Sequence, residues 1–300
     1  MADLGGDSTY DVTMHFPDVQ SFAAALGRTP KGGPLALIVA DDAVEIDSTI
    51  THHLSIGFSR VALFVPQELQ LTDDWPEQVD VIPYDTRQPA AATRIANACI
   101  AAAPDRWFYL GHNAEYLFFP FCSTRVVPEL LNFATEERRP VVMCTTLDLY
   151  SSDLVQHPNA VDRDTAHFDS MGYYSEEVTD TEGQKQEAQL AIYGGIRWRM
   201  EELFPENRRR LDRPALFRAC KDLQMDNDKR FNIAEYNTIS CPWHHSITAC
   251  VASFRAAKAL MRNPTSRKAI SSFTCFQSQR FDWSDQQLLD LGFMEPGQWF

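Results

Sequence analysis

The first half of the chain alternates short apolar stretches with segments of helical periodicity. Five apolar stretches predict strands buried in a parallel sheet, and they cover residues 35–39, 61–65, 79–82, 107–110 and 141–145. Three stretches between them predict helices, at residues 47–56, 90–103 and 127–135. A strand, a helix and a strand in about 30 residues is typical of a right-handed βαβ unit. We therefore expect a doubly wound α/β unit up to residue 150.

The remaining regions show weaker patterns. Residues 1–34 predict a polar lead-in with a short helical patch at 19–26. Residues 151–240 are polar and predict a loop-rich section. Beyond it we expect a helix over about 246–262, and a last helix that begins at Ser284, where Gln287 would complete a capping box.

The composition excludes several structural and functional classes of protein. Hydrophobic residues make up 44% of the chain, which allows a sizeable core. The net charge of -14 argues against non-specific binding to nucleic acid or to anionic membranes. The seven cysteines form no CxxC pair, so we expect neither a zinc site nor a disulfide framework. No signal-peptide run or membrane-length apolar stretch is present, which predicts a cytoplasmic protein without a transmembrane segment.

Polar groups follow three of the predicted strands. Asp41 and Asp42 follow the first strand, Asp85 follows the third, and residues 112–115 follow the fourth. Ligands of open parallel sheets bind beyond the carboxyl ends of the strands, so these groups mark a candidate site. The chain has no GxGxxG or GxxxxGK[ST] motif. A pyrophosphate would therefore need a metal ion or basic side chains.

Several segments resemble glycosyltransferase family 2. THHLSIGF (51–58) lies within a strand, helix and strand that resemble the opening of that family, and WFYLGHNAEYLFFP (107–120) resembles its W-x-x-x-x-D-x-D-E-F-L strand and turn. Further segments are similar to features of a bacterial subgroup, namely TTLDLYSSD (145–153), HFDSMGYY (167–174), GGIRWR (194–199), CPWHH (241–245), SFRAAK (253–258) and EPGQWF (295–300). The resemblance covers about residue 35 to the end.

The resemblance implies a GT-A fold, with a Rossmann-like, mainly parallel mixed sheet flanked by helices and a C-terminal helical extension. Residues 35–150 would form the nucleotide-binding half and residues 151–300 the acceptor side of one continuous domain. The implied reaction transfers a sugar from a nucleotide-sugar to a saccharide or glycolipid acceptor in surface polysaccharide assembly. The enzyme would act from the cytosol, at the inner face of the membrane where the acceptor is a glycolipid.

The family's D-x-D carboxylates hold a divalent metal ion, Mn²⁺ or Mg²⁺, which neutralises the diphosphate. Alignment of Glu115 on the family's glutamate puts His112 and Ala114 at the two aspartate positions. Ala114 has no ligand atom, and imidazole favours transition metals. The remaining candidate metal ligands are His112, Glu115, His244 and His245.

The other site residues follow from the strand ends and from the segments that carry the resemblance. We expect donor contacts from Asp41, Asp42, Asp85, Asn113, Arg197 and Arg199. Asp169, and after it Asp148, is the candidate base for an inverting transfer. Simpler structural roles compete with these assignments: the two arginines would pair with Glu201 and Glu202, and His52 and His53 would pack or cap a helix.

Three functions remain open from the sequence. The first is an active glycosyltransferase. The second is a degenerate glycosyltransferase-like binding module, favoured by the altered D-x-D motif. The third is another nucleotide-binding α/β transferase, such as a nucleotidyltransferase, because a shared sheet does not fix the reaction.

Overall fold

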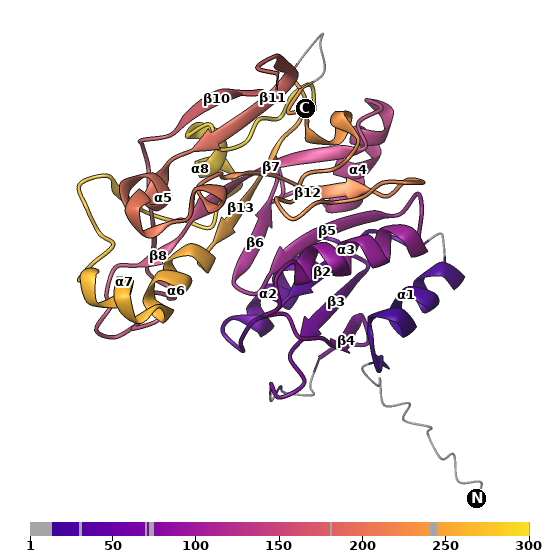
Figure 1. Cartoon of the computed structure of the whole chain (residues 1–300), viewed down its shortest axis with the longest axis horizontal. Helices are drawn as coiled ribbons and strands as arrows, with labels where there is room; N and C mark the ends of the chain where they lie inside the picture. The colour runs from indigo at the N-terminus through magenta and orange to yellow at the C-terminus, as the bar shows by residue number, and fades with distance from the viewer. Residues whose placement is uncertain are drawn as a thin grey trace, which may run out of the picture.

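The protein is built on one large curled sheet (Figure 1). A computed structural model describes residues 14–29, 32–69, 71, 75–180, 182–240 and 245–299. Within these ranges the sheet has nine strands, in the order β1 (Met14–His15), β4 (Val79–Pro83), β3 (Arg60–Val65), β2 (Leu35–Val39), β5 (Trp107–His112), β12 (Asp212–Arg218), β7 (Val141–Asp148), β13 (Ala249–Ser253) and β6 (Glu115–Phe118).

Most strands of this sheet are parallel. β1, β4, β3, β2 and β5 all run in one direction. β12 runs antiparallel to both of its neighbours, β5 and β7, whereas β13 is parallel to β7. The edge strand β6 is antiparallel to β13. The expected mixed, mainly parallel α/β sheet is therefore confirmed, and it is compatible with a Rossmann-like fold.

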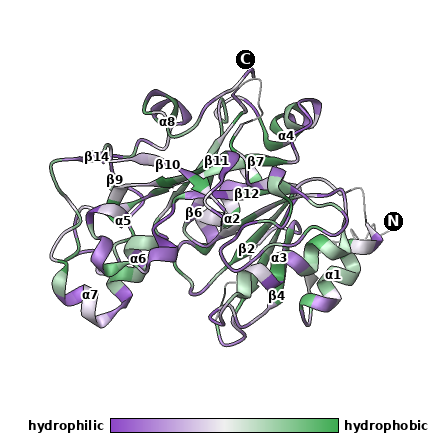
Figure 2. Cartoon of the chain, turned by 45° about the horizontal axis from the view of Figure 1, so that its top comes forward, coloured by the Kyte–Doolittle hydropathy of each residue, from purple (hydrophilic) through white to green (hydrophobic). Residues whose placement is uncertain are grey.

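Helices cover both faces of the sheet because its strands are apolar on both sides. In β2, Leu35, Leu37 and Val39 pack with α1 (Val19–Arg28) and α3 (Ala91–Ala102). The alternate residues of β2 pack with α2 (Ile46–Ser55) and α4 (Val127–Glu136) on the opposite face. Figure 2 shows the hydrophobic residues gathered along the central strands. This period-2 division follows from strand geometry.

Smaller elements complete the chain. One small sheet contains β8 (Tyr150–Ser151), β9 (Ala166–Asp169) and β14 (Ser278–Arg280), and another contains β10 (Tyr174–Thr179) and β11 (Lys185–Tyr193). The short helices are α5 (Gly195–Arg199), α6 (Arg255–Arg262), α7 (Pro264–Ala269) and α8 (Asp285–Asp290). Single 3-10 turns cover Glu201–Leu203, Glu206–Arg208 and Ala234–Asn237. Within the described ranges we find no helix with the length and apolar character that a bilayer crossing requires.

Three predictions about the second half were wrong. The expected helix over 246–262 begins only at Arg255, because the residues before it form β13, which is buried between β7 and β6. The section expected to be loops contributes β12 to the middle of the sheet. Gln287 does not complete a capping box, because its side chain bonds Asp282 and Arg280 instead. Tertiary pairing overrides local propensity in the first two cases.

Candidate functional site

The loop after β2 and the turn after β5 lie together, because β2 and β5 are neighbouring parallel strands. The carboxamide of Asn113 joins them: its Oδ1 accepts from the Asp41 amide at 3.3 Å, and its Nδ2 donates to the Asp42 carboxylate at 2.7 Å and to the Val44 carbonyl at 2.8 Å. Asn113 is only 1% exposed. The structure thus brings the predicted residues Asp41, Asp42 and Asn113 together, with Asn113 as an internal clamp.

The altered motif forms a tight turn. Ala114 has a φ of 61°, a left-handed conformation that costs a non-glycine residue about 1 kcal/mol. Its amide donates to Thr49 Oγ1 at 2.9 Å. The turn directs Glu115 back toward the sheet, where its carboxylate accepts from the His112 amide at 2.9 Å, from Ser253 Oγ at 3.0 Å and from Arg213 Nη2 at 2.8 Å.

Burial controls the charges in this turn. Burial lowers the pKa of His112 well below its ordinary value, and the nearby cations Arg255 and Lys229 act in the same direction. His112 is therefore neutral at physiological pH. Burial alone would raise the pKa of Glu115, but Arg213 and His112 outweigh it and hold that pKa well below the ordinary range. Glu115 is thus an ionised carboxylate bound to Arg213.

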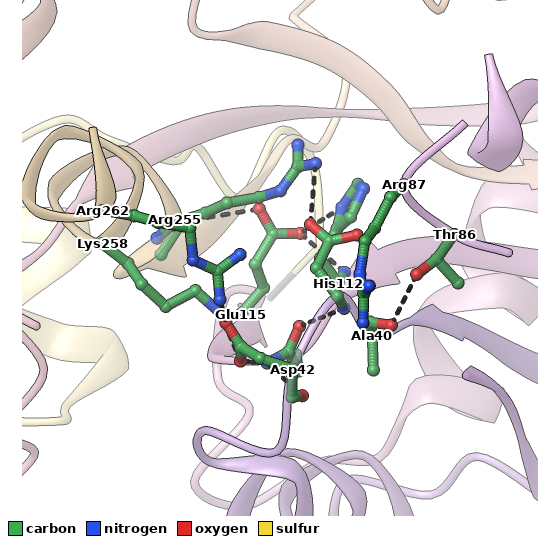
Figure 3. A network of polar contacts seen from close by, with 12 residues as sticks. Ala40, Asp42, Thr86, Arg87, His112, Glu115, Arg255, Lys258 and Arg262 are labelled. Carbon is green, nitrogen blue, oxygen red and sulfur yellow. Dashed lines mark hydrogen bonds and ion pairs between the residues drawn. The ribbon is translucent and has the colours of Figure 1, made fainter. Parts of the chain in front are cut away.

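Three cations of α6 face the loop after β2. Arg255 lies 3.6 Å from the Asp41 carboxylate, Lys258 Nζ lies 3.0 Å from that of Asp42, and Arg262 also pairs with Asp42. Figure 3 shows these side chains beside Asp42, with His112 and Glu115 close by. The spacing i, i+3 and i+7 puts the three cations on one face of the helix.

Lys229 adds a further cation from a tight turn. Asp226 Oδ1 accepts from the amides of Asp228 and Arg230, at 2.9 and 2.8 Å, and Lys229 between them has a φ of 60°. Burial lowers the pKa of Lys229 well below the ordinary lysine value, and Arg255 and Arg213 lower it further. The next residue, Arg230, donates to the Asp212 carbonyl at 2.9 Å, so the turn that carries Lys229 lies beside the start of β12, next to Arg213.

We call this group the carboxyl-edge cluster. Its members are Asp41, Asp42, His112, Glu115, Arg213, Lys229, Arg255, Lys258 and Arg262. Four cations, Arg213, Arg255, Lys258 and Arg262, pair with the three carboxylates, and the histidine is neutral. Lys229 is a fifth basic side chain, whose pKa burial lowers. The cluster therefore carries an excess of positive charge in a protein whose formal net charge is -14.

The other candidate residues form matched ion pairs beside this cluster. Arg197 makes two hydrogen bonds to Asp148, at 2.6 and 2.9 Å, and Arg199 makes two to Asp169, at 2.9 and 3.1 Å. Both carboxylate side chains are 1% exposed. Burial raises the pKa of Asp148, and Arg197 opposes that rise. The competing expectation that the arginines pair with Glu201 and Glu202 was wrong, because α5 turns both guanidinium groups toward these buried aspartates.

Two predicted site residues lie apart from the cluster. Asp85 is exposed and caps its own turn, where it accepts from the Arg87 amide and from Gln88 Nε2. His245 precedes the amino end of β13, whereas Glu115 pairs with Ser253 at its carboxyl end. His245 instead contacts Glu295, at 3.5 Å. The structure thus does not bring His245 to His112 and Glu115, and His244 lies outside the described residues.

Sequence reasoning missed all five basic residues of the cluster. Two signals were present: SFRAAK carries Arg255 and Lys258, and Lys229 lies in the charged run 226–230. Arg213 has no local signal, because its position depends on the pairing of β12 with β7.

The comparisons with known proteins do not assign the chain to a family. No protein-family model matches the chain, and no curated protein is found to match it. The functional argument therefore rests on the fold and on the geometry of the cluster.

Proposed function

We propose that the protein is a glycosyltransferase that binds a nucleotide-sugar at the carboxyl edge of the main sheet. The observation that carries this proposal is the positive excess of the carboxyl-edge cluster. Ligands of parallel sheets bind at this edge, and an excess of positive charge there favours an anion. The diphosphate of a nucleotide-sugar has the matching charge. The mixed sheet and the resemblance of residues 35–300 to family 2 support the GT-A assignment.

The proposed reaction has a leaving group and an acceptor. The sugar passes from the nucleoside diphosphate to a hydroxyl of a saccharide or glycolipid, and the cluster stabilises the negative charge left on the diphosphate. The acceptor would be a component of surface polysaccharide assembly, reached from the cytosol.

The transfer also needs a group that takes the acceptor proton. Asp148 and Asp169 are each held by two hydrogen bonds from an arginine, whereas Asp41 has a single ion-pair contact with Arg255 at 3.6 Å and a side chain that is 22% exposed. An accessible, weakly paired carboxylate fits a general base better than a buried one with two charged hydrogen bonds. We therefore propose Asp41 for this role, in place of Asp148 and Asp169.

A second candidate function is a degenerate module that binds nucleotide-sugars without turnover. The locked pairs Arg197–Asp148 and Arg199–Asp169 favour it, because they remove both aspartates that the family resemblance offers as bases.

Both functions are tested by binding and turnover. Thermal shift assays with UDP-, GDP- and dTDP-sugars, with and without Mn²⁺, should give a rise in melting temperature for at least one donor. Release of the nucleoside diphosphate, followed by chromatography, then separates an enzyme from a binding module. The absence of a shift with every donor would contradict both functions.

A further inference from the structure

We infer that Lys229 and Arg255 bind the diphosphate group directly and take the place of a divalent metal ion. This inference rests on the proposed function and names the residues and chemistry of its donor site. It follows from the residue types of the two side chains, the exposure of Arg255, the backbone of Lys229 and the contacts of their neighbours.

The described residues do not fit a divalent metal ion. Among them we find no group of three or more metal-binding side chains. His112 and Glu115 come nearest, but Oε2 of Glu115 already accepts from Arg213 and from the His112 amide. Arg213 pairs with Glu115, and Arg255 also lowers the pKa of Glu115, so a metal ion there would face two positive charges. Hard cations require open carboxylate oxygens, and this site offers cations instead.

Contacts within the cluster leave two cations available. Arg213 is bound to Glu115, and both Lys258 and Arg262 pair with Asp42. Arg255 has only the 3.6 Å contact with Asp41, and its side chain is 40% exposed. Among the residues that the structure describes, no carboxylate forms an ion pair with Lys229. Two like charges held near one another repel, and an anion bound between them removes that repulsion.

The backbone holds Lys229 in place before any ligand binds. Its turn is attached to α3, because Asn97 bonds the amide and carbonyl of Met225, at 2.8 and 2.9 Å, and Thr93 donates to the Asp226 carbonyl at 3.1 Å. Lys229 itself keeps a left-handed φ of 60°, which is unfavourable for a lysine. Strained residues of this kind concentrate at functional sites. The rigid attachment reduces the entropy lost when Lys229 contacts an anion.

Isothermal titration calorimetry with inorganic pyrophosphate, UDP and the UDP-, GDP- and dTDP-sugars, in EDTA and then in Mn²⁺, tests the inference. Wild-type protein should bind pyrophosphate and at least one nucleotide-sugar in EDTA. Lys229→Gln and Arg255→Gln should each weaken the binding of pyrophosphate by about tenfold or more, since each removes a charged hydrogen bond. Lys229→Arg should bind within a few fold of wild type. Lys221→Gln removes an equal charge from an exposed position beyond the carboxyl end of β12, at the opposite edge, and should bind as wild type.

The outcomes separate the inference from the proposed function. Binding that requires Mn²⁺, or binding that both glutamine variants retain in full, would overturn the inference and leave the glycosyltransferase proposal standing. Pyrophosphate binding in EDTA that depends on both residues, without binding of any nucleotide-sugar, would support the anion site and contradict the glycosyltransferase proposal. Cooperative thermal unfolding of each variant without ligand would show that the loss of binding is local.

Discussion

Arginines meet buried carboxylates in two neighbouring regions of this protein, with a different charge balance in each. In the pairs Arg197–Asp148 and Arg199–Asp169, each guanidinium faces one carboxylate through two hydrogen bonds. In the carboxyl-edge cluster, four cations pair with three carboxylates, and a fifth basic side chain, Lys229, has no carboxylate partner among the described residues. The two regions border each other, since Asp148 of β7 and Glu115 of β6 both flank Ser253 of β13.

The difference separates a structural role from the proposed binding role. In a matched pair, each charge is neutralised by its partner and is not available to a ligand. Removal of one partner leaves the other buried without a counter-charge. A cation without a carboxylate partner raises the free energy of the unliganded protein. It becomes favourable only when an anion binds. Residue type alone did not distinguish the two regions, because arginines suited to a phosphate clamp occur in both.

The largest expected effect is on the matched pairs. Arg197→Met should reduce the free energy of unfolding by about 3–5 kcal/mol, because it leaves the buried Asp148 without its partner. Urea unfolding measures this change. The double variant Asp148→Leu with Arg197→Met should recover part of the loss, since two apolar side chains leave no stranded charge. A loss below about 1 kcal/mol in the single variant would show that the pair is not structural.

An intermediate effect is expected from pH. Burial, Arg255 and Arg213 lower the pKa of Lys229, while Glu115 raises it and Arg197 lowers it more weakly. A lowered pKa means that Lys229 loses its proton, and its charge, at a pH where an ordinary lysine keeps both. The affinity for pyrophosphate should therefore fall as the pH rises, by up to about tenfold, at a pH below the ordinary lysine pKa of about 10.4.

The variant Lys229→Arg provides the control for this measurement, because arginine keeps its charge over the whole pH range. Pyrophosphate itself also titrates, and the comparison of the two proteins at each pH removes that contribution. Identical pH profiles for wild type and Lys229→Arg would exclude Lys229 as the titrating group.

The smallest effect concerns the unliganded cluster. Lys229→Gln and Arg255→Gln should each change the free energy of unfolding by less than about 0.5 kcal/mol, or increase it, because each relieves repulsion between like charges. Urea unfolding in phosphate-free buffer measures this. A large destabilisation, comparable with that of Arg197→Met, would make these cations structural and would remove the contrast between the two regions.

Much of the first half could be predicted from the sequence. The strands β2, β3, β4, β5 and β7 and the helices between them lie at the expected positions, because each strand is buried on both faces and reads as an apolar run. The packing roles expected for His52 and His53 are also confirmed, since their ring nitrogens bond the Leu117 and Thr49 carbonyls at 2.8 Å. Burial lowers the pKa of His52 to about 4 and that of His53 to about 3, so both are neutral.

The second half and most of the site could not be predicted, for reasons of topology. The apolar residues of Ala249–Ser253 are compatible with either a helix or a buried strand. The pairing of this segment with β7 and β6 makes it a strand. Arg197 lies 49 residues from Asp148 and Arg199 lies 30 from Asp169, so no local pattern joins them. Asp41, Asp42 and Asn113 were predictable because they follow neighbouring parallel strands. Arg213, Lys229 and Arg255 come from three later elements whose places depend on the whole sheet.

The position of β12 has a consequence for how the chain folds during synthesis. β12 lies between β5 and β7, although it follows both in the sequence by more than 60 residues. Until residues 212–218 leave the ribosome, β5 and β7 cannot both be paired as they are in the native sheet, and their edges stay open to other chains. Such long-range pairing is slow to form and exposes apolar strands in the meantime. A fragment that ends near residue 150 should therefore aggregate, and chaperone contact should persist until β12 has emerged.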